Sequence, residues 1–215
     1  MVPSVSRRNL SVFLVHGRST WTRLHYRGNS QMNNQSKMAK QEHRPRIFKL
    51  FSVLLSYPDE NLLESSEDLR FELSTLSEFP TMAPCRYFLD FLDSTPLIVV
   101  EEIYTTVFDF NVQTCLNLTY HEHGETRERG AALASFRQLY KNEGYEQSNS
   151  ELPDYLPVAL EFLSLCSDET CSAILDRHIP HMDVLAARLK ELGHPYHNVM
   201  EALSLTCREF TAKGV

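Results

Sequence analysis

The apolar side chains of this sequence recur at the spacing of α-helices from residue 47 onward, and this pattern constrains the fold more than any other feature. The first run places apolar residues at positions i, i+3, i+4, i+7 and i+8, which form one face of a helix. A Tyr-Pro-Asp turn at residues 57–59 ends that run. The members of this first face are Ile47, Leu50, Phe51, Leu54 and Leu55.

Seven further segments show the same spacing, separated by short polar or Pro- and Gly-containing stretches. Thr95 and Pro96 begin one helix as its N-cap and first-turn residue, and Pro180 is expected to kink or divide another. Residues 111–120 alternate instead, which indicates an extended or irregular link. We therefore predict one all-α domain of roughly eight helices spanning residues 47–215. The further helical segments are residues 60–78, 84–93, 96–108, 128–142, 153–163, 168–192 and 196–210.

Charge divides the chain at residue 46. Residues 1–46 carry nine Lys or Arg and the single acid Glu42, a charge of +8, whereas residues 47–215 carry -15. The basic segment has no helical or strand periodicity, and its polar runs at residues 28–31 and 33–36 are typical of disorder. We expect residues 1–46 to be a disordered basic leader that is dispensable for the domain. An acidic body does not suit a phosphate backbone, so nucleic-acid binding is disfavoured for residues 47–215.

Three interpretations of the leader stay open. The stretch Ser6-Arg7-Arg8-Asn9-Leu10 resembles a twin-arginine export signal, but the apolar run after it spans six residues and an export signal needs about 7–15. A basic, acid-poor leader also resembles an organellar transit peptide. We favour a solvated tail or an over-extended start, with initiation at Met32 or Met38.

Cysteine usage indicates a reducing cytosol, and hydropathy indicates no membrane-spanning helix. The five cysteines are scattered without a Cys-x-x-Cys spacing, which predicts free thiols in a reducing compartment. The chain has no run of about 18 apolar residues, so no transmembrane helix is expected. It also has no P-loop, Gly-x-Gly-x-x-Gly or Gly-x-Ser-x-Gly motif that would indicate an enzyme.

The densest polar cluster spans residues 120–130 and admits three interpretations. His121 and His123 stand at i and i+2 around Glu122, whereas a zinc helix needs histidines at i and i+4. They would diverge on a helix but share a face on an extended segment, so a metal-dependent enzyme built on these three residues stays open. Alternatively, Thr126 caps a helix whose first turns carry Arg127 and Arg129 paired with carboxylates. The third interpretation is polar contact with a partner.

A second cluster spans residues 151–163. Pro153 and Pro157 are four residues apart, which a helix tolerates only near its start. Asp154 and Glu161 are two turns apart and would share a face, either as a plain polar surface or as an acidic rim beside an apolar groove. The histidine pairs 178/181 and 194/197 are interrupted by prolines, so we expect surface or capping roles for them rather than metal binding.

These two clusters carry a family resemblance. The run Glu122-His123-Gly124-Glu125-Thr126-Arg127-Glu128-Arg129-Gly130, followed by Glu151-Leu152-Pro153-Asp154-Tyr155-Leu156-Pro157, resembles the respiratory nitrate reductase molybdenum-cofactor assembly chaperones. This family, the nitrate reductase delta subunit, groups with the all-helical chaperones of dimethyl sulfoxide and trimethylamine N-oxide reductases. The resemblance covers about residues 47–210. Two motifs depart from it: Val107 replaces Leu in Tyr-x-x-Leu-Phe, and Tyr155 replaces His in Glu-x-Pro-Asp-His.

The resemblance implies a chaperone rather than an enzyme. Such a protein binds the apo catalytic (alpha) subunit of nitrate reductase in the cytoplasm, assists insertion of the molybdenum guanine-dinucleotide cofactor and prevents premature membrane attachment. It holds no cofactor or metal of its own, since the cofactor belongs to the client. A chaperone of the same fold for another molybdoenzyme is the alternative.

Surplus aromatic and acidic side chains would receive an amphipathic, basic segment from the N-terminus of the client. Most of these aromatic residues could equally belong to the core. The candidate client-binding residues are Tyr104, Phe108, Tyr120, His121, Glu122, His123, Glu125, Arg127, Arg129, Glu151, Asp154, Tyr155 and Glu161.

Overall fold

The structure of the protein, a computed structural model, describes residues 21–23 and 35–211. The interpretations of residues 6–10, of the polar run 28–31 and of Met32 as a start lie outside the described residues. Within them the fold is helical, which confirms the predicted all-α class.

Ten α-helices are described, two more than expected. The additional helices arise because Ser65 separates two helices within residues 60–78, and because one turn of helix forms at the end of the predicted link, from Tyr120 to His123. The α-helices are α1 (Gln35–Leu55), α2 (Glu60–Glu64), α3 (Ser66–Thr75), α4 (Cys85–Ser94), α5 (Leu97–Tyr104), α6 (Tyr120–His123), α7 (Arg127–Asn142), α8 (Leu156–Leu163), α9 (Asp168–Glu191) and α10 (His197–Cys207). Shorter elements are the 3₁₀ turns η3 (Pro80–Met82) and η5 (Arg208–Phe210), the π-helical turn η4 (Thr105–Asp109), and the strands β1 (Trp21–Arg23) and β2 (Tyr145–Gln147).

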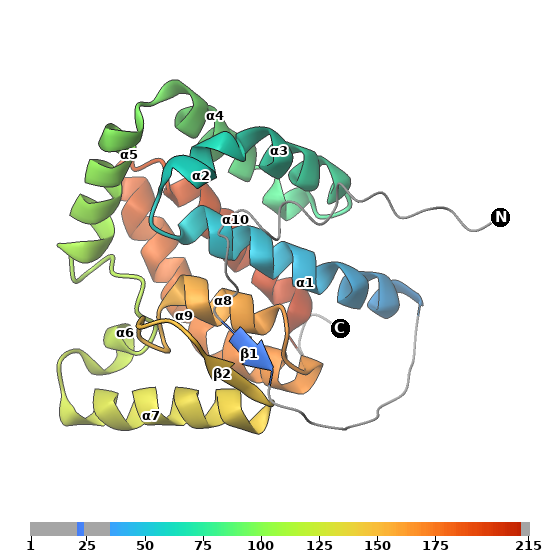
Figure 1. Ribbon diagram of the computed structural model, residues 1–215, viewed down its shortest axis with the longest axis vertical. Helices are drawn as coiled ribbons and strands as arrows, with labels where there is room; N and C mark the ends of the chain where they lie inside the picture. Colours follow the sequence, from blue (N-terminus) through green and yellow to red (C-terminus); the bar gives the residue numbers. More distant parts are fainter. Residues whose placement is uncertain (1–20, 24–34, 212–215) are drawn as a thin grey trace.

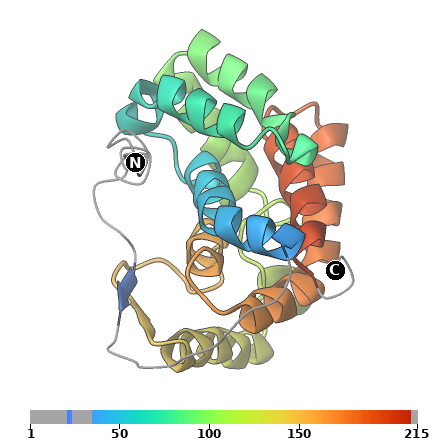
Figure 2. The same ribbon diagram turned by 90° about the vertical axis from the view of Figure 1, so that its right-hand side faces the viewer.

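The helix α1 runs through the middle of the molecule (Figure 1). Helices α3 and α4 lie on one side of it, and α8 lies on the other, with α7 at the far edge. A view turned by 90° shows the same order and places α10 beside α1 (Figure 2). The α7 edge is therefore remote from the α3–α4 layer.

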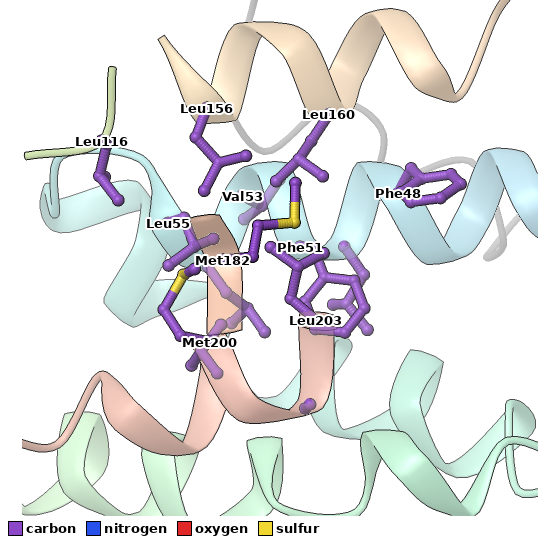
Figure 3. Packing of buried hydrophobic residues seen from close by; sticks show 14 of the residues in the cluster. Phe48, Phe51, Val53, Leu55, Leu116, Leu156, Leu160, Met182, Met200 and Leu203 are labelled. Carbon is purple, nitrogen blue, oxygen red and sulfur yellow. The ribbon is translucent and has the colours of Figure 1, made fainter. Parts of the chain in front are cut away.

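The core is built around α1 because this helix is apolar on most of its circumference from residue 47 to 55. Residues 47, 48, 50, 51 and 53–55 are all buried. Ser52, one of the two polar residues of the run, donates a hydrogen bond of 2.8 Å to the carbonyl of Pro157 at the start of α8. Figure 3 shows Phe48, Phe51, Val53 and Leu55 of α1 gathered with Leu156 and Leu160 of α8, Met182 of α9, and Met200 and Leu203 of α10.

Of the two expected effects of Pro180, a kink or a division of the helix, the division is wrong, because α9 continues through Pro180. Proline removes one backbone donor but does not end a helix whose neighbouring turns are held by packing. Here Ile179 and Met182 are buried on either side of the exposed Pro180. Ser167 caps the start of this helix by accepting a hydrogen bond from the Thr170 amide.

The helix α1 begins at Gln35, twelve residues before the predicted start of the domain. Arg44 donates to the carbonyls of Leu163 (2.7 Å), the last residue of α8, and Cys166 (2.6 Å), which follows that helix. Arg46 pairs with the buried Glu72 of α3 at 2.6 Å. The boundary at residue 46 thus falls inside α1. The first half of α1 was missed because polar side chains and Pro45 interrupt the apolar spacing. Arg44 and Arg46 are held by residues that are distant in sequence.

The only strand pairing among the described residues is antiparallel, between β1 and β2, with Thr22 opposite Glu146. Within the described part of the chain, no helix is both long and apolar enough to cross a membrane. The five cysteines are free, as predicted.

Candidate functional site

A groove with a volume of about 650 Å³ lies between α7 and α9. Its base is apolar, with the buried Phe136 from α7 and Ile174 from α9. Small side chains line both walls, so the two helices leave a trough instead of filling it. The lining residues are Thr119, His123, Glu128, Ala131, Ala132, Ser135, Phe136, Leu139, Glu169, Thr170, Ala173, Ile174, Arg177 and His178.

The rim of the groove carries charge of both signs. Glu128 in the first turn of α7 and Glu169 in the first turn of α9 are acidic. Arg177, about two turns further along α9, is basic. An apolar trough with polar edges is the form of site that accepts an amphipathic segment.

Glu143 joins α7 to α9 at one end of the groove. Its carboxylate accepts hydrogen bonds from the Ser167 amide (3.0 Å), the Ser167 hydroxyl (2.7 Å) and the Thr170 hydroxyl. Burial raises the pKa of Glu143, but the hydrogen bonds from Thr170 and Ser167 outweigh it, and the net pKa is lowered. The carboxylate thus fixes the first turn of α9 against the last turn of α7.

Glu122 joins α6 to α9 near the groove. The Arg177 guanidinium donates to both of its oxygens, at 3.1 and 2.6 Å, and this hydrogen bonding lowers the pKa of Glu122. The Nδ1 atoms of His178 and His181 lie 3.6 and 3.9 Å from the same carboxylate. Burial lowers the pKa of His178 to about 4, so its imidazole is neutral.

The predicted metal group of residues 121–123 does not assemble. These residues lie on the single turn α6, where His121 and His123 diverge as a helix requires. The Nε2 atom of His121 makes a hydrogen bond of 2.8 Å with the Cys115 carbonyl, and burial lowers the pKa of this histidine. Of the three residues, only His123 lines the groove.

Asp154 is buried and does not form part of an acidic rim, which corrects the prediction. Its carboxylate accepts from the Thr119 amide (3.1 Å), the Thr119 hydroxyl (2.6 Å) and the Asn117 amide group (3.1 Å). The backbone reinforces this junction, because Leu118 donates to the Asp154 carbonyl at 2.9 Å. The Pro-Asp motif therefore fastens the link of residues 111–120 to the start of α8.

Glu161 is also buried, and the prediction that it shares an exposed face with Asp154 is wrong. The ammonium group of Lys49 on α1 lies 2.6 Å from the Glu161 carboxylate. The helix α8 begins at Leu156, three residues later than predicted, so Asp154 precedes it and does not share its face. The ion pair of Lys49 with Glu161 instead holds α8 to α1.

The predicted groove aromatics Tyr104 and Phe108 belong to the core. Both are buried, and their ring centroids lie 4.9 Å apart. The Tyr104 hydroxyl donates to the Leu55 carbonyl at 2.9 Å and is hydrogen-bonded to the half-buried Tyr155. These tyrosines therefore join α1, α5 and the start of α8.

The remaining candidates are on or near the surface. Tyr120 is half-buried beneath the Arg129 guanidinium, which lies 5.1 Å from its ring centroid. The Arg129 side chain also lies 3.9 Å from the Asp154 carboxylate, as the carboxylate-pairing interpretation expected. Glu125, Arg127 and Glu151 are exposed, and none of them lines the groove.

Sequence reasoning missed most of the groove. It predicted a helix over residues 128–142 but gave no binding role to Ala131, Ala132, Ala173 or Ile174. The available signal was the small residues Ala131, Ala132 and Ser135, since a helix with small side chains on one face leaves space against its neighbour. The α9 wall has no local signal, because its place opposite α7 is set by the tertiary fold.

The helical fold and the groove place the protein in a class of known architecture. Its fold resembles that of a putative redox enzyme maturation protein from Archaeoglobus fulgidus, with a TM-score of 0.54 and 22% identity, covering 86% of this chain and 98% of that one. The family model described as nitrate reductase delta subunit matches residues 80–200. The chain belongs to this family, which confirms the resemblance read from the motifs.

Two curated relatives illustrate the family. The probable nitrate reductase molybdenum cofactor assembly chaperone NarJ of Bacillus subtilis is 30% identical over 160 residues, covering 74% of this chain and 87% of the relative. The probable assembly chaperone NarW of Escherichia coli is 33% identical over 162 residues, covering 74% of this chain and 66% of that protein. These relatives are named as assembly chaperones, which supports a chaperone role for this chain.

Proposed function

We propose that this protein is a cytoplasmic, non-enzymatic chaperone that binds the apo catalytic subunit of a respiratory nitrate reductase in its α7–α9 groove. It keeps that subunit competent to receive its molybdenum guanine-dinucleotide cofactor before membrane assembly. The cofactor belongs to the client and not to the chaperone. The observation that carries the proposal is the apolar, small-residue trough with a charged rim in a member of this family.

The groove suits a short helical segment from the client's N-terminus. Ala131, Ala132 and Ala173 leave room for large apolar side chains, which would pack on Phe136 and Ile174. Basic residues on the polar face of the segment would meet Glu128 and Glu169. Of the predicted client-binding residues, His123 contributes directly, and Glu122, Glu125 and Arg127 would act near the groove.

Filling the groove tests the proposal. In isothermal titration of the full chain against peptides covering the N-terminal segment of the catalytic subunit, Ala132→Trp should weaken binding at least about tenfold, because the indole occupies the trough. Ala134→Trp is the matched control, since residue 134 is exposed on the same helix and does not line the groove. Binding should also weaken as salt concentration rises.

Equal affinities of the Ala132→Trp and Ala134→Trp variants would reject the groove as the docking site. A full complement of cofactor in nitrate reductase from a deletion strain would reject the chaperone role itself. Co-purification of a different molybdoenzyme, without nitrate reductase, would favour the alternative client.

A further inference from the structure

We propose that Glu122 on α6, with His178 and His181 on α9, forms a binding site for a divalent transition-metal ion of the zinc class. The inference is independent of the proposed chaperone function. It also departs from the expectation that the chain binds no metal, and it uses a different set of residues from the group predicted at residues 121–123.

The donor atoms converge. One carboxylate oxygen of Glu122 and one ring nitrogen from each histidine all lie within 4.8 Å of one another. The carboxylate-to-Nδ1 distances are 3.6 Å for His178 and 3.9 Å for His181. A tetrahedral ion with bonds of about 2.1 Å separates its ligands by about 3.4 Å, so the donor atoms would have to approach one another by at most about 1.4 Å to complete the site. The remaining position would be open to water.

The ring nitrogens that face Glu122 have no hydrogen-bond partner in the described structure. The Nδ1 atoms of both His178 and His181 are buried and have no hydrogen-bond partner there. A buried polar nitrogen without a partner is costly and calls for a ligand. A metal ion would accept the lone pair of each Nδ1 atom, and the set of two histidines and one glutamate is one that zinc uses in proteins.

Arg177 orients the Glu122 carboxylate and can stay hydrogen-bonded to it when an ion binds. It donates to both oxygens of Glu122, and each oxygen keeps a further lone pair. Metal-ligating carboxylates are commonly held by such hydrogen bonds. Because His178 and Arg177 also line the α7–α9 groove, the ion would fix α6 against α9 at the groove wall.

Metal titration of the purified full chain tests this inference. We expect one equivalent of Zn²⁺ to bind saturably in competition with a chromogenic chelator, and to raise the thermal unfolding temperature. Glu122→Gln and His181→Gln should each weaken that binding at least about tenfold. The matched control is His123→Gln, because His123 approaches the other Glu122 oxygen at 3.5 Å but stands outside the converging group.

Cobalt substitution gives a second readout that is independent of affinity. Co²⁺ bound by two imidazoles and a carboxylate should show visible absorption without a thiolate charge-transfer band in the near ultraviolet. Circular dichroism establishes that each variant is folded. The inference is overturned by no one-to-one binding, by equal affinity in the folded Glu122→Gln and His181→Gln variants, or by a thiolate band, which would assign the ion to a cysteine.

Discussion

At the scale of single residues, a charged side chain of the motif at residues 151–157 is buried completely. Asp154 is fully buried, yet its three hydrogen-bond donors come from the link of residues 111–120. A carboxylate satisfied in this way positions backbone that has no regular structure of its own. The chemical identity of Asp154 therefore matters to folding before any client is present.

Replacing Asp154 should destabilise the protein strongly. Asp154→Ala leaves the Thr119 amide and hydroxyl without a buried partner, and it should lower the free energy of unfolding by about 3 kcal/mol. Glu151→Ala, at an exposed position of the same motif, should change it by less than about 0.5 kcal/mol. Urea denaturation of the two variants measures the difference, and similar values would contradict the structural role assigned to Asp154.

Residue burial is the level that the sequence predicted least well. Tyr104 and Phe108 were expected at a groove and lie in the core, and Glu161 was expected at a rim and pairs with Lys49. Helical spacing identifies which residues share a face, but it does not say whether that face meets solvent or another helix. Glu161 is acidic in sequence and buried in space because its partner comes from a helix over a hundred residues away.

At the scale of elements, the junction of α7 with α9 depends on one carboxylate. Glu143→Gln weakens three hydrogen bonds to the first turn of α9, so it should cost about 1 kcal/mol at neutral pH. Because the folded pKa of Glu143 is lowered, its stabilising effect is complete above the unfolded value of about 4.3 and is lost as the pH falls through the lower folded value. The stability gap between wild type and Glu143→Gln should therefore narrow in acid.

Thermal unfolding of both proteins between neutral and acidic pH measures that gap. Glu146→Gln provides the control, since Glu146 is exposed in the neighbouring strand. A gap that stays constant through the acid range would show that the Glu143 carboxylate is not the group responsible.

The helices themselves were largely predictable, whereas their ends were less so. Apolar spacing located the segments that became α1, α4, α7, α9 and α10. The starts of α8 and α5 were placed too early, because Pro153 and Pro96 mark turns that precede these helices. The extent of α9 was predicted as residues 168–192 and is observed as Asp168–Glu191, but the helix is not divided at Pro180.

At the scale of the whole molecule, α1 connects segments that are far apart in the sequence. Its polar half reaches α3 through Arg46 and the end of α8 through Arg44. No local pattern could reveal this, since each contact depends on a partner fixed only by the complete fold.

Removing Arg46 should therefore be costly. Arg46→Ala strands the buried Glu72 carboxylate and should lower the free energy of unfolding by about 3 kcal/mol. Arg70→Ala, which removes an exposed guanidinium from Asp90 and Asp93, should cost no more than about 1 kcal/mol. Chemical denaturation of the Arg46→Ala and Arg70→Ala variants measures the difference.

We also expect a chain beginning at residue 47 to be less stable than one beginning at residue 35. That result would contradict the expectation that the whole of segment 1–46 is dispensable for the domain.

The long-range pairing of α1 with α8 also affects how the protein is made. Ser52 meets its partner Pro157 only after 105 further residues have been joined, which takes about 5–20 s at ordinary translation rates of about 5–20 residues per second. During that interval the apolar circumference of α1 has no α8 to cover it on the ribosome. During its own synthesis, a protein of a chaperone family would thus expose an apolar surface of the kind that general cellular chaperones bind.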